Sequence, residues 1–345
     1  MNYFITHCDE KYLKYAERLF ESLKTYSSNK IIFFTVGFDY ESKFDNVISI
    51  KFNLDDYFSN ISHGELNKDF FVFLKPLIVD VLLSNDIHAS YKDSLFCYLD
   101  VDCIANEKCD NVFAKKDILT NYPLLNLGCQ QFMIKDGRGN PFSDDDKINL
   151  ELTLEAPLLK KLGYDINSRT LNYLQTGVFL FNSECSVFIK KWKDLCFSDL
   201  ITKDWRFLAP YHEETVINCL LWQIKDVKNL DRAIINVPES LDEAKVMFDK
   251  LKNPLEGLQR ISAFCTIPAK KNMKNLCFLH GKFSEEVYNL IVSKTKKLYL
   301  KIHSTSLGDT LAATPLLRKL NKAYKTRINV VTHIKDIFIN NQYIR

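Results

Sequence analysis

Two carboxylates placed two residues apart, Asp100 and Asp102, are the side chains of this sequence best suited to bind a cation. They stand at the end of the apolar run SLFCYLDV, residues 94–101, whose composition predicts a buried strand. Carboxylates this close repel each other unless a cation joins them, and their oxygens are ligands for hard divalent ions. Since alternate residues of an extended chain point to one side, we expect both side chains to converge on one ion.

The position of this pair, rather than its spacing, favours a site. A second Asp-x-Asp pair, Asp144 and Asp146, lies in the polar loop 136–147 and is typical of a solvated turn. An exposed acidic turn is also the alternative for Asp100 and Asp102. A binding site is favoured if their strand belongs to a parallel sheet, because ligands of such sheets bind beyond the carboxyl ends of the strands.

The order of apolar runs predicts a sheet of this kind. Strands are expected at residues 3–6, 31–36, 47–50 and 94–101, and helices at 12–23 and 70–83. This order predicts an α/β fold in which a mainly parallel sheet is flanked by helices. Further along the chain, we expect strands at 173–182 and 276–279 and helices at 183–197, 212–223 and 285–296.

Composition narrows the class of protein. The chain has 345 residues, and 46 Lys and Arg nearly balance 43 Asp and Glu, so we expect no nucleic-acid partner. Ten cysteines without a C-x-x-C pair lack zinc-site spacing and indicate a reduced, intracellular protein. The start, MNYFITHCDEKY, has no signal-peptide pattern, and no apolar stretch is long enough for a transmembrane segment. We therefore expect a cytoplasmic protein, with peripheral association at a membrane as the alternative.

Six segments in one order give the sequence its resemblance to a known family. They are FITHCDEKYLKYAERLFESL (4–23), FLKPLIVDVLL (73–83), YLDVD (98–102), YLQTGVFLFN (173–182), HEETVINCLLW (212–222) and FLHGK (278–282). They extend over nearly all of residues 1–290, and the chain resembles the GT-A glycosyltransferases, especially the family 8 branch of glycogenin and related galactosyltransferases. The resemblance implies a GT-A fold for a first domain of residues 1–296.

The same resemblance implies a metal and donor site. Asp100, Asp102 and His280 would hold Mn²⁺ or Mg²⁺ at the diphosphate of a nucleotide-sugar donor. The other residues that would bind the donor are Thr6, Asp9, Tyr12, Lys75, Gly177 and Lys282. A core position on a helix is the alternative for Tyr12, and a solvated position on an amphipathic helix is the alternative for Lys75.

Four residues would act in catalysis by this resemblance: Asp102, Gln175, Glu213 and Glu214. Gln175, with Thr176 and Gly177, would line the sugar and acceptor pocket, and the two glutamates would contact the donor sugar or the acceptor. Alternatively, the glutamates are first-turn charges that complement a helix dipole. An inverting enzyme requires a carboxylate base for the acceptor hydroxyl and a retaining one does not; the sequence leaves both open.

The function expected is a metal-dependent, hexosyltransferase-like glycosyltransferase that moves a sugar from a nucleotide-diphosphate donor, with UDP as the favoured nucleotide, to a glycan or lipid-linked acceptor. One alternative is a sugar-phosphate nucleotidyltransferase. Those enzymes carry a Gly-rich basic loop after the first strand, whereas residues 6–12 here read THCDEKY. The other alternative is a non-catalytic carbohydrate- or protein-binding module on a degenerate transferase fold.

Residues 297–345 are expected to form a separate β-α-β fragment. LYLKI (298–302) and INVVT (328–332) predict strands, with a Leu-Gly-Asp turn and a helix at 310–324 between them. This segment resembles the start of the family 9, heptosyltransferase-like GT-B enzymes, where Asp309 would fall on the acceptor base. The alternative is an elaboration of the first domain. About 50 residues cannot build a GT-B domain, so we expect the chain to continue past Arg345 in a longer, two-transferase protein.

Overall fold

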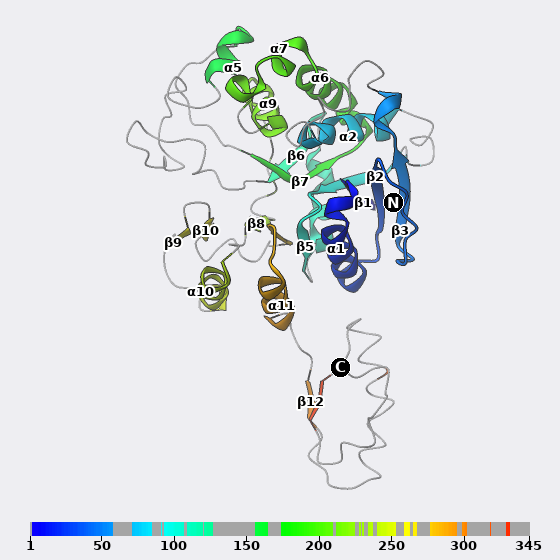
Figure 1. The fold of residues 1–345 in the computed structure, drawn as a ribbon, viewed down its shortest axis with the longest axis vertical. Coiled ribbons are helices and arrows are strands. Elements are labelled where there is room, and N and C mark those ends of the chain that lie inside the picture. Colours follow the sequence, from blue (N-terminus) through cyan, green and yellow to red (C-terminus); the bar gives the residue numbers. More distant parts are fainter. Residues whose placement is uncertain are drawn as a thin grey trace. The chain divides into compact units, whose positions relative to one another are not determined.

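Six strands form the main sheet of the computed structural model, in the order β3-β2-β1-β4-β7-β6 (Figure 1). They are β1 Asn2–Cys8, β2 Lys30–Val36, β3 Val47–Phe52, β4 Leu95–Leu99, β6 Leu124–Asn126 and β7 Gln175–Phe181. The first four of these in sequence order pair in parallel, and β7 pairs antiparallel with both β4 and β6. The prediction of a mainly parallel α/β sheet is therefore confirmed.

The structure describes the following residues: 2–57, 71–84, 91, 93–106, 109–119, 121–126, 156–164, 174–209, 212–224, 228, 230, 234–236, 240–252, 259–262, 265–267, 277–294, 299–301, 318 and 329–331. They divide into two compact units, Met1–Phe283 and Ser284–Arg345. The expected loop 136–147, with Asp144 and Asp146, lies outside the described residues.

Helices cover both faces of the main sheet. Phe20 of α1 (Leu13–Tyr26) packs against Phe33 of β2, with ring centroids 5.0 Å apart. Trp192 of α6 (Ser186–Cys196) packs against Phe179 of β7 at 5.8 Å. Because side chains alternate along a strand, the strand register places Phe33 and Phe179 on opposite faces. Helices α2 and α9 pack with α6 on its side of the sheet (Figure 1).

Helix α2 (Leu74–Ser84) is buried along most of its length, and Pro76 lies in its first turn, where a missing N–H costs no hydrogen bond. Helix α9 (His212–Leu221) is joined to the start of β7 by the buried side chain of Asn218. Asn218 accepts from the backbone N–H of Leu174 and donates to its carbonyl, both at 2.9 Å. This pair of hydrogen bonds fixes the second half of α9 beside Leu174, the residue before β7.

A second, three-stranded sheet has the order β5-β11-β8. Its strands are β5 Cys103–Ala105, β11 Phe278–His280 and β8 Ile234–Asn236. Of these, only β11 was expected from the sequence. The remaining elements of the first unit are 3₁₀ segments at Glu10–Tyr12, Leu54–Asp56, Phe71–Phe73, Cys109–Ile118 and Ser183–Cys185, helices α5 Ala156–Lys161, α7 Asp199–Thr202, α8 Trp205–Leu208 and α10 Leu241–Lys252, and strands β9 Gln259–Ser262 and β10 Cys265–Ile267.

The second unit contains α11 (Glu285–Lys294) and two short strands, β12 (Tyr299–Lys301) and β13 (Asn329–Val331). The strands pair in parallel, as consecutive strands of a β-α-β fragment would. The division after Phe283 places α11 in this unit, whereas the sequence suggested a boundary after residue 296. The expected turn with Asp309 lies outside the described residues, as does the expected helix 310–324 apart from Arg318.

The cysteines and the helices of the described part bear on what the composition predicts. Eight of the cysteines among them, Cys8, Cys97, Cys103, Cys109, Cys185, Cys196, Cys219 and Cys277, are buried, and Cys97 and Cys277 pack as small apolar side chains in the core. No helix in the described part of the chain is long and apolar enough to cross a membrane.

Replacing Trp192 by Phe should destabilise the first unit. The indole Nε1 donates to the carbonyl of Glu213 at 2.9 Å, inside the core between α6 and α9. Trp192→Phe would leave that carbonyl without its donor, at a cost of about 1–3 kcal/mol. Val187→Ala on the same helix is the control: Val187 is 80% exposed, and its loss should change the free energy of unfolding by less than about 0.5 kcal/mol. Equal urea midpoints for both variants would contradict the assigned role.

Candidate active site

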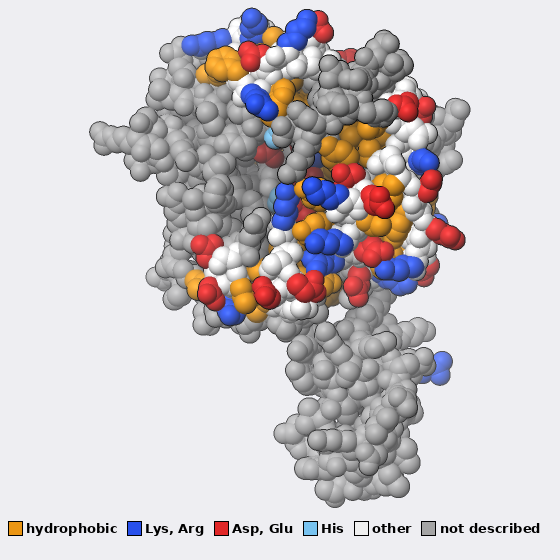
Figure 2. Space-filling model, viewed as in Figure 1, with side chains coloured by type: hydrophobic (Ala, Val, Ile, Leu, Met, Phe, Trp, Pro, Cys, Tyr) orange, Lys and Arg blue, Asp and Glu red, His pale blue; other side chains and the backbone are white. Residues whose placement is uncertain are grey.

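A pocket of about 360 Å³ opens at the carboxyl ends of β1 and β4, the edge at which ligands of parallel sheets bind. Figure 2 shows this face hollowed, with basic side chains at the edge of the hollow. The predicted site residues that line the pocket are Asp9, Tyr12, Lys75, Asp100, Asp102, Gln175, Thr176, Glu213, Glu214, His280 and Lys282. Thr6 and Gly177 are not among the lining residues: Thr6 is buried in the core, and Gly177 accepts the backbone N–H of Asp100 at 2.8 Å.

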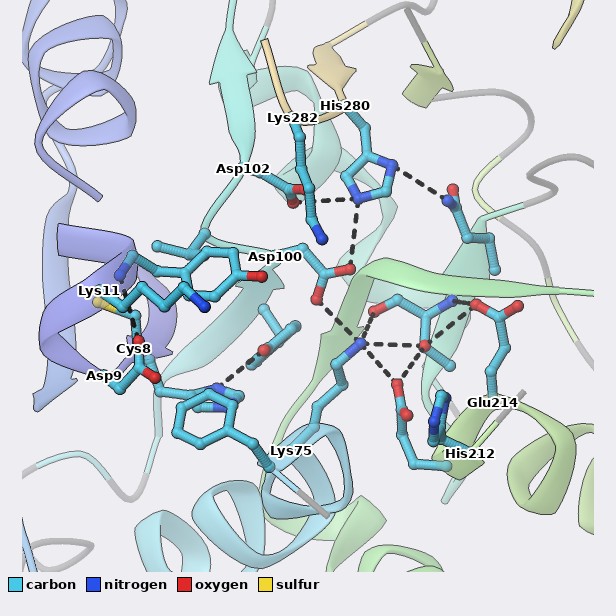
Figure 3. Close-up of a pocket in the computed structure, with 18 residues that line it drawn as sticks. Cys8, Asp9, Lys11, Lys75, Asp100, Asp102, His212, Glu214, His280 and Lys282 are labelled. Carbon is cyan, nitrogen blue, oxygen red and sulfur yellow. Dashed lines mark hydrogen bonds and ion pairs between the residues drawn. The ribbon is translucent and has the colours of Figure 1, made fainter. Parts of the chain in front are cut away.

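Asp100, Asp102 and His280 meet at one side of the pocket (Figure 3). One potential ligand atom from each of the three lies within 4.8 Å of the others. The His280 Nε2 is 3.2 Å from an Asp102 oxygen and 3.5 Å from an Asp100 oxygen. Two carboxylates and an imidazole form a donor set that fits a divalent cation.

The backbone explains why these three residues converge. The register of β11 on β5 places His280 opposite Cys103, the residue directly after Asp102. The N–H of Gly281 also donates to the Asp102 carbonyl at 3.1 Å. The expectation that an extended chain aligns the two aspartates is wrong: β4 ends at Leu99, and the Cys103 N–H donates to the Asp100 carbonyl at 3.0 Å. A turn between β4 and β5 therefore brings the carboxylates together.

The negative charges of Asp100 and Asp102 favour a protonated His280 when no cation is bound. Burial opposes the charged imidazole, but the carboxylates of Asp102 and Asp100 outweigh it and raise the pKa of His280 to about 10. Burial would likewise raise the pKa of Asp100, but Lys75 and His280 hold it below its ordinary value. The protonated imidazole thus supplies positive charge to both acids.

Gln175 lies behind His280 rather than at the front of the pocket. Its side-chain Nε2 is 3.3 Å from the His280 Nδ1, the ring nitrogen that faces away from the aspartates (Figure 3). A partner at the second ring nitrogen orients a histidine ligand and selects its tautomer. This contact gives Gln175 a positioning role toward His280.

Lys75, in the first turn of α2, connects the aspartates to the glutamates of α9. Its ammonium lies 2.9 Å from Asp100, 2.9 Å from Glu213, and 3.1 and 3.2 Å from the hydroxyl and carbonyl of Thr176. Burial would lower the pKa of Lys75, but the two carboxylates raise it well above its ordinary value. Lys75 is 4% exposed, so the alternative, a solvated lysine on an amphipathic helix, does not apply.

The two glutamates at the start of α9 differ in their surroundings. Glu213 is buried, and its carboxylate accepts from both Lys75 and the Thr176 hydroxyl. Glu214 is partly exposed, and one of its oxygens accepts from the Thr176 backbone N–H at 3.0 Å. The same oxygen lies 3.3 Å from the Thr176 hydroxyl, whose one proton it shares with the closer Glu213. Thr176 is therefore the residue that holds both carboxylates.

The opposite side of the pocket is formed by the segment after β1. Asp9 begins the 3₁₀ turn there, and its carboxylate accepts the Tyr12 N–H at 3.1 Å. The Lys282 ammonium lies 5.6 Å from the centre of the Tyr12 ring, within range of a cation–π contact. Tyr12 is half-buried and lines the pocket, so it is not purely a core residue.

Several residues that line the pocket were not predicted from the sequence, among them His7, Tyr98 and His212. The His7 Nδ1 and the Tyr98 hydroxyl are 2.9 Å apart. Burial, aided by Lys75, lowers the pKa of His7 to about 3, so its ring is neutral. His7 lies one residue beyond the strand predicted at 3–6, and the register that places it on the same face as Tyr98 is given by the structure and not by the sequence. His212 has a φ of 58°, a strained value for a residue with a Cβ, and nothing in its sequence context signals that.

Comparison with known proteins does not assign a family. No protein-family model matches the chain, and no curated protein matches it. A structure of the galactosyltransferase LgtC with donor and acceptor sugar analogs is 13% identical, with a TM-score of 0.45 over 81% of this chain and 86% of that one. A structure of an active-site mutant of LgtC is 13% identical, with a TM-score of 0.45 over 86% of this chain and 97% of that one. Similarity at this level does not establish an activity.

The protonated state of His280 predicts a pH-dependent stability. A folded-state pKa of about 10, above the unfolded value of about 6.5, contributes stability that is complete below the unfolded value and lost as pH rises through the folded one. In the presence of a chelator, the free energy of unfolding should therefore fall between pH 6.5 and 8.5 by up to about 1.4 kcal/mol per pH unit. His280→Gln should lack this slope. Parallel curves for the two proteins would contradict a charged His280.

The contacts of Thr176 predict that two small substitutions at this position reduce the stability by different amounts. Thr176→Val keeps the shape but removes the hydroxyl that contacts Lys75, Glu213 and Glu214. Because these groups are largely buried, the variant should lose about 1–3 kcal/mol of unfolding free energy. Thr176→Ser keeps the hydroxyl and should lose less. Urea denaturation of the metal-free protein measures both, and a Val variant as stable as the wild type would show that the hydroxyl is dispensable.

Proposed function

We propose that the unit Met1–Phe283 is a metal-dependent glycosyltransferase that moves a sugar from a nucleotide-diphosphate donor to a glycan or lipid-linked acceptor. The observation that carries this proposal is the meeting of Asp100, Asp102 and His280 in a pocket at the carboxyl ends of parallel strands. They come from two of the six segments on which the resemblance to GT-A family 8 enzymes is based, YLDVD (98–102) and FLHGK (278–282).

In this proposal, Asp100, Asp102 and His280 hold Mn²⁺ or Mg²⁺. The bound cation would act as a Lewis acid for the negative charge that develops on the departing diphosphate. His280 gives up its proton when it binds a cation, because only the neutral imidazole is a ligand. Nδ1 keeps its proton during this change, so the Gln175 amide, 3.3 Å away, would keep the ring oriented by presenting its oxygen to that proton.

The nucleotide is assigned to the side of the pocket formed by the turn after β1. Tyr12 presents its ring there, and Asp9 is placed by its capping contact with the Tyr12 N–H. Lys282, above the Tyr12 ring, is positioned to neutralise phosphate oxygens. UDP is the nucleotide we propose. Thr6 and Gly177 do not line the pocket, and the Gly177 carbonyl instead accepts the backbone N–H of Asp100.

The sugar and the acceptor are assigned to the side formed by Thr176 and α9. Glu213 is buried in an ion pair with Lys75 and is not positioned to take a proton from an acceptor. Glu214 is the partly exposed one of the two glutamates at the start of α9, and it is the group we propose to contact the reacting sugar or acceptor hydroxyl. In an inverting reaction it would be the general base.

For the second unit, we propose the start of a GT-B, heptosyltransferase-like domain. The support is the parallel pairing of β12 with β13, since parallel neighbours require a crossover connection of the kind that opens a Rossmann-like half.

Metal-dependent release of UDP tests the proposed activity. A panel of UDP-sugars with Mn²⁺ should yield free UDP, and Asp102→Asn should reduce the rate at least about 100-fold because a ligand of the cation is lost. Asp199→Asn is the control, since Asp199 lies on α7 with its side chain 86% exposed. Full turnover in the presence of a chelator would refute the assignment. Pyrophosphate release from a sugar phosphate and a nucleoside triphosphate would establish the nucleotidyltransferase instead, and metal-dependent UDP binding without turnover would indicate a binding module.

A further inference from the structure

We infer that Tyr98 fixes the tautomer of His7, so that the Nε2 of His7 is an uncharged N–H donor in the pocket and binds an uncharged oxygen of the ligand. His7 is then a ligand-binding residue, and Tyr98 is the residue that positions its proton. The inference deepens the proposed function and rests on it for the ligand, a nucleotide-sugar. The state of His7 itself follows from contacts within the protein.

Neighbouring parallel strands bring the two side chains together. Ile5 of β1 pairs with Tyr98 of β4, so His7, two residues further along β1, points to the same face. The Tyr98 hydroxyl and the His7 Nδ1 are 2.9 Å apart, and both residues are buried. The Tyr98 ring is also stacked on Phe179, with centroids 5.0 Å apart. The hydroxyl is therefore held against one nitrogen of the His7 ring.

The tautomer of His7 follows from what the Tyr98 hydroxyl can bind. This hydroxyl has one proton to donate, and the acceptor that the described residues offer it is the His7 Nδ1. The Lys75 ammonium, 5.2 Å from the centre of the Tyr98 ring, has donors only. A proton on Nδ1 would leave the buried hydroxyl proton without an acceptor, which is costly. Nδ1 is therefore the acceptor, and the proton of the neutral His7 ring lies on Nε2.

The second nitrogen of this ring, Nε2, opens into the pocket. His7 lines the pocket, and no residue in the described part of the chain forms a hydrogen bond with its Nε2. Nε2 is also absent from the described side-chain atoms that are buried without a partner, so it keeps access to the pocket. Ligand pockets use a few such placed polar groups to fix the orientation of what they bind.

The contact with Tyr98 keeps His7 from becoming a cation. A second ring proton would have to enter at Nδ1, where it would break the hydrogen bond from the Tyr98 hydroxyl. Burial and the charge of Lys75 also lower the pKa of His7 to about 3. Phosphate oxygens are bound most strongly by charged donors. A donor that stays neutral is better matched to a carbonyl or hydroxyl oxygen.

An apolar ring beside this donor agrees with an uncharged ligand group. Phe71 lies next to His7, with ring centroids 5.5 Å apart, and it also lines the pocket. Phe71 is half-buried, so part of its surface is open to a ligand. Both the nucleoside and the sugar of a nucleotide-sugar carry carbonyl or hydroxyl oxygens, and the test distinguishes these two sources.

NMR of protein labelled with ¹⁵N-histidine tests the tautomer without any ligand. For His7, we expect a protonated Nε2 and an unprotonated Nδ1, and His7→Gln identifies these signals by their loss. In Tyr98→Phe, both ring nitrogens should move toward the averaged shifts of exchanging tautomers. Tyr122→Phe is the matched control and should leave the signals unchanged, because Tyr122 packs against Phe188 and is not among the described lining residues.

The same signals identify the ligand oxygen. UDP-glucose with Mg²⁺ should shift the Nε2 signal, and it should bind the wild type at least about tenfold more tightly than His7→Leu, which lacks the donor. A shift with uridine or UDP, but not with pyrophosphate, would assign the oxygen to the nucleoside. A shift that requires UDP-glucose would assign it to the sugar. A shift produced equally by pyrophosphate would contradict an uncharged ligand oxygen.

Three results would overturn the inference and leave the proposed function standing: a proton on Nδ1 of the wild type, His7 signals that Tyr98→Phe leaves unchanged, or UDP-glucose binding that does not move the Nε2 signal. Absence of any metal-dependent binding of UDP or UDP-glucose would overturn both. If Tyr98→Phe does not fold, the wild-type spectrum still decides the tautomer.

Discussion

The buried ammonium of Lys75 ties the candidate active-site pocket to the core. It joins α2, the end of β4, the first residues of β7 and the start of α9 through Asp100, Thr176 and Glu213. A buried charge is tolerated only when it is paired and hydrogen-bonded, and removal of one partner leaves the other as an uncompensated charge. The four segments therefore hold one another in position, and the chemistry of the pocket and the stability of the fold depend on the same contacts.

The metal triad depends in turn on the small second sheet. Asp100 and Asp102 lie in the turn between β4 of the main sheet and β5 of the smaller one, and His280 ends β11, which pairs with β5. Because the register of a strand pair moves in steps of one residue and reverses faces with each step, His280 can reach the aspartates in one register only. The short antiparallel pair of β5 and β11 thus determines whether His280 meets the two aspartates.

Parts of this arrangement could be predicted from the sequence and parts could not. Five strands of the main sheet and the helices α1, α2, α6 and α9 carry long apolar runs, so these elements and the position of Asp100 and Asp102 at the end of one strand could be predicted. Strand β6, with three residues, could not. Strands β5 and β8 have three residues each, too few for a period to appear. His280 was identified through its resemblance to a family motif. The four contacts of Lys75 join segments far apart in sequence, and no local pattern encodes them.

The buried cysteines have a consequence for how this protein can be observed. Burial raises the pKa of thiols such as Cys97, Cys103 and Cys196 well above the ordinary value, and only the thiolate reacts with alkylating reagents. In the native state these side chains are therefore inert, and each becomes reactive when the segment that buries it opens. Cys103 borders the metal triad and Cys196 ends α6. The alkylation rate of each of these cysteines therefore reports how often the region that buries it opens, from the site to the core.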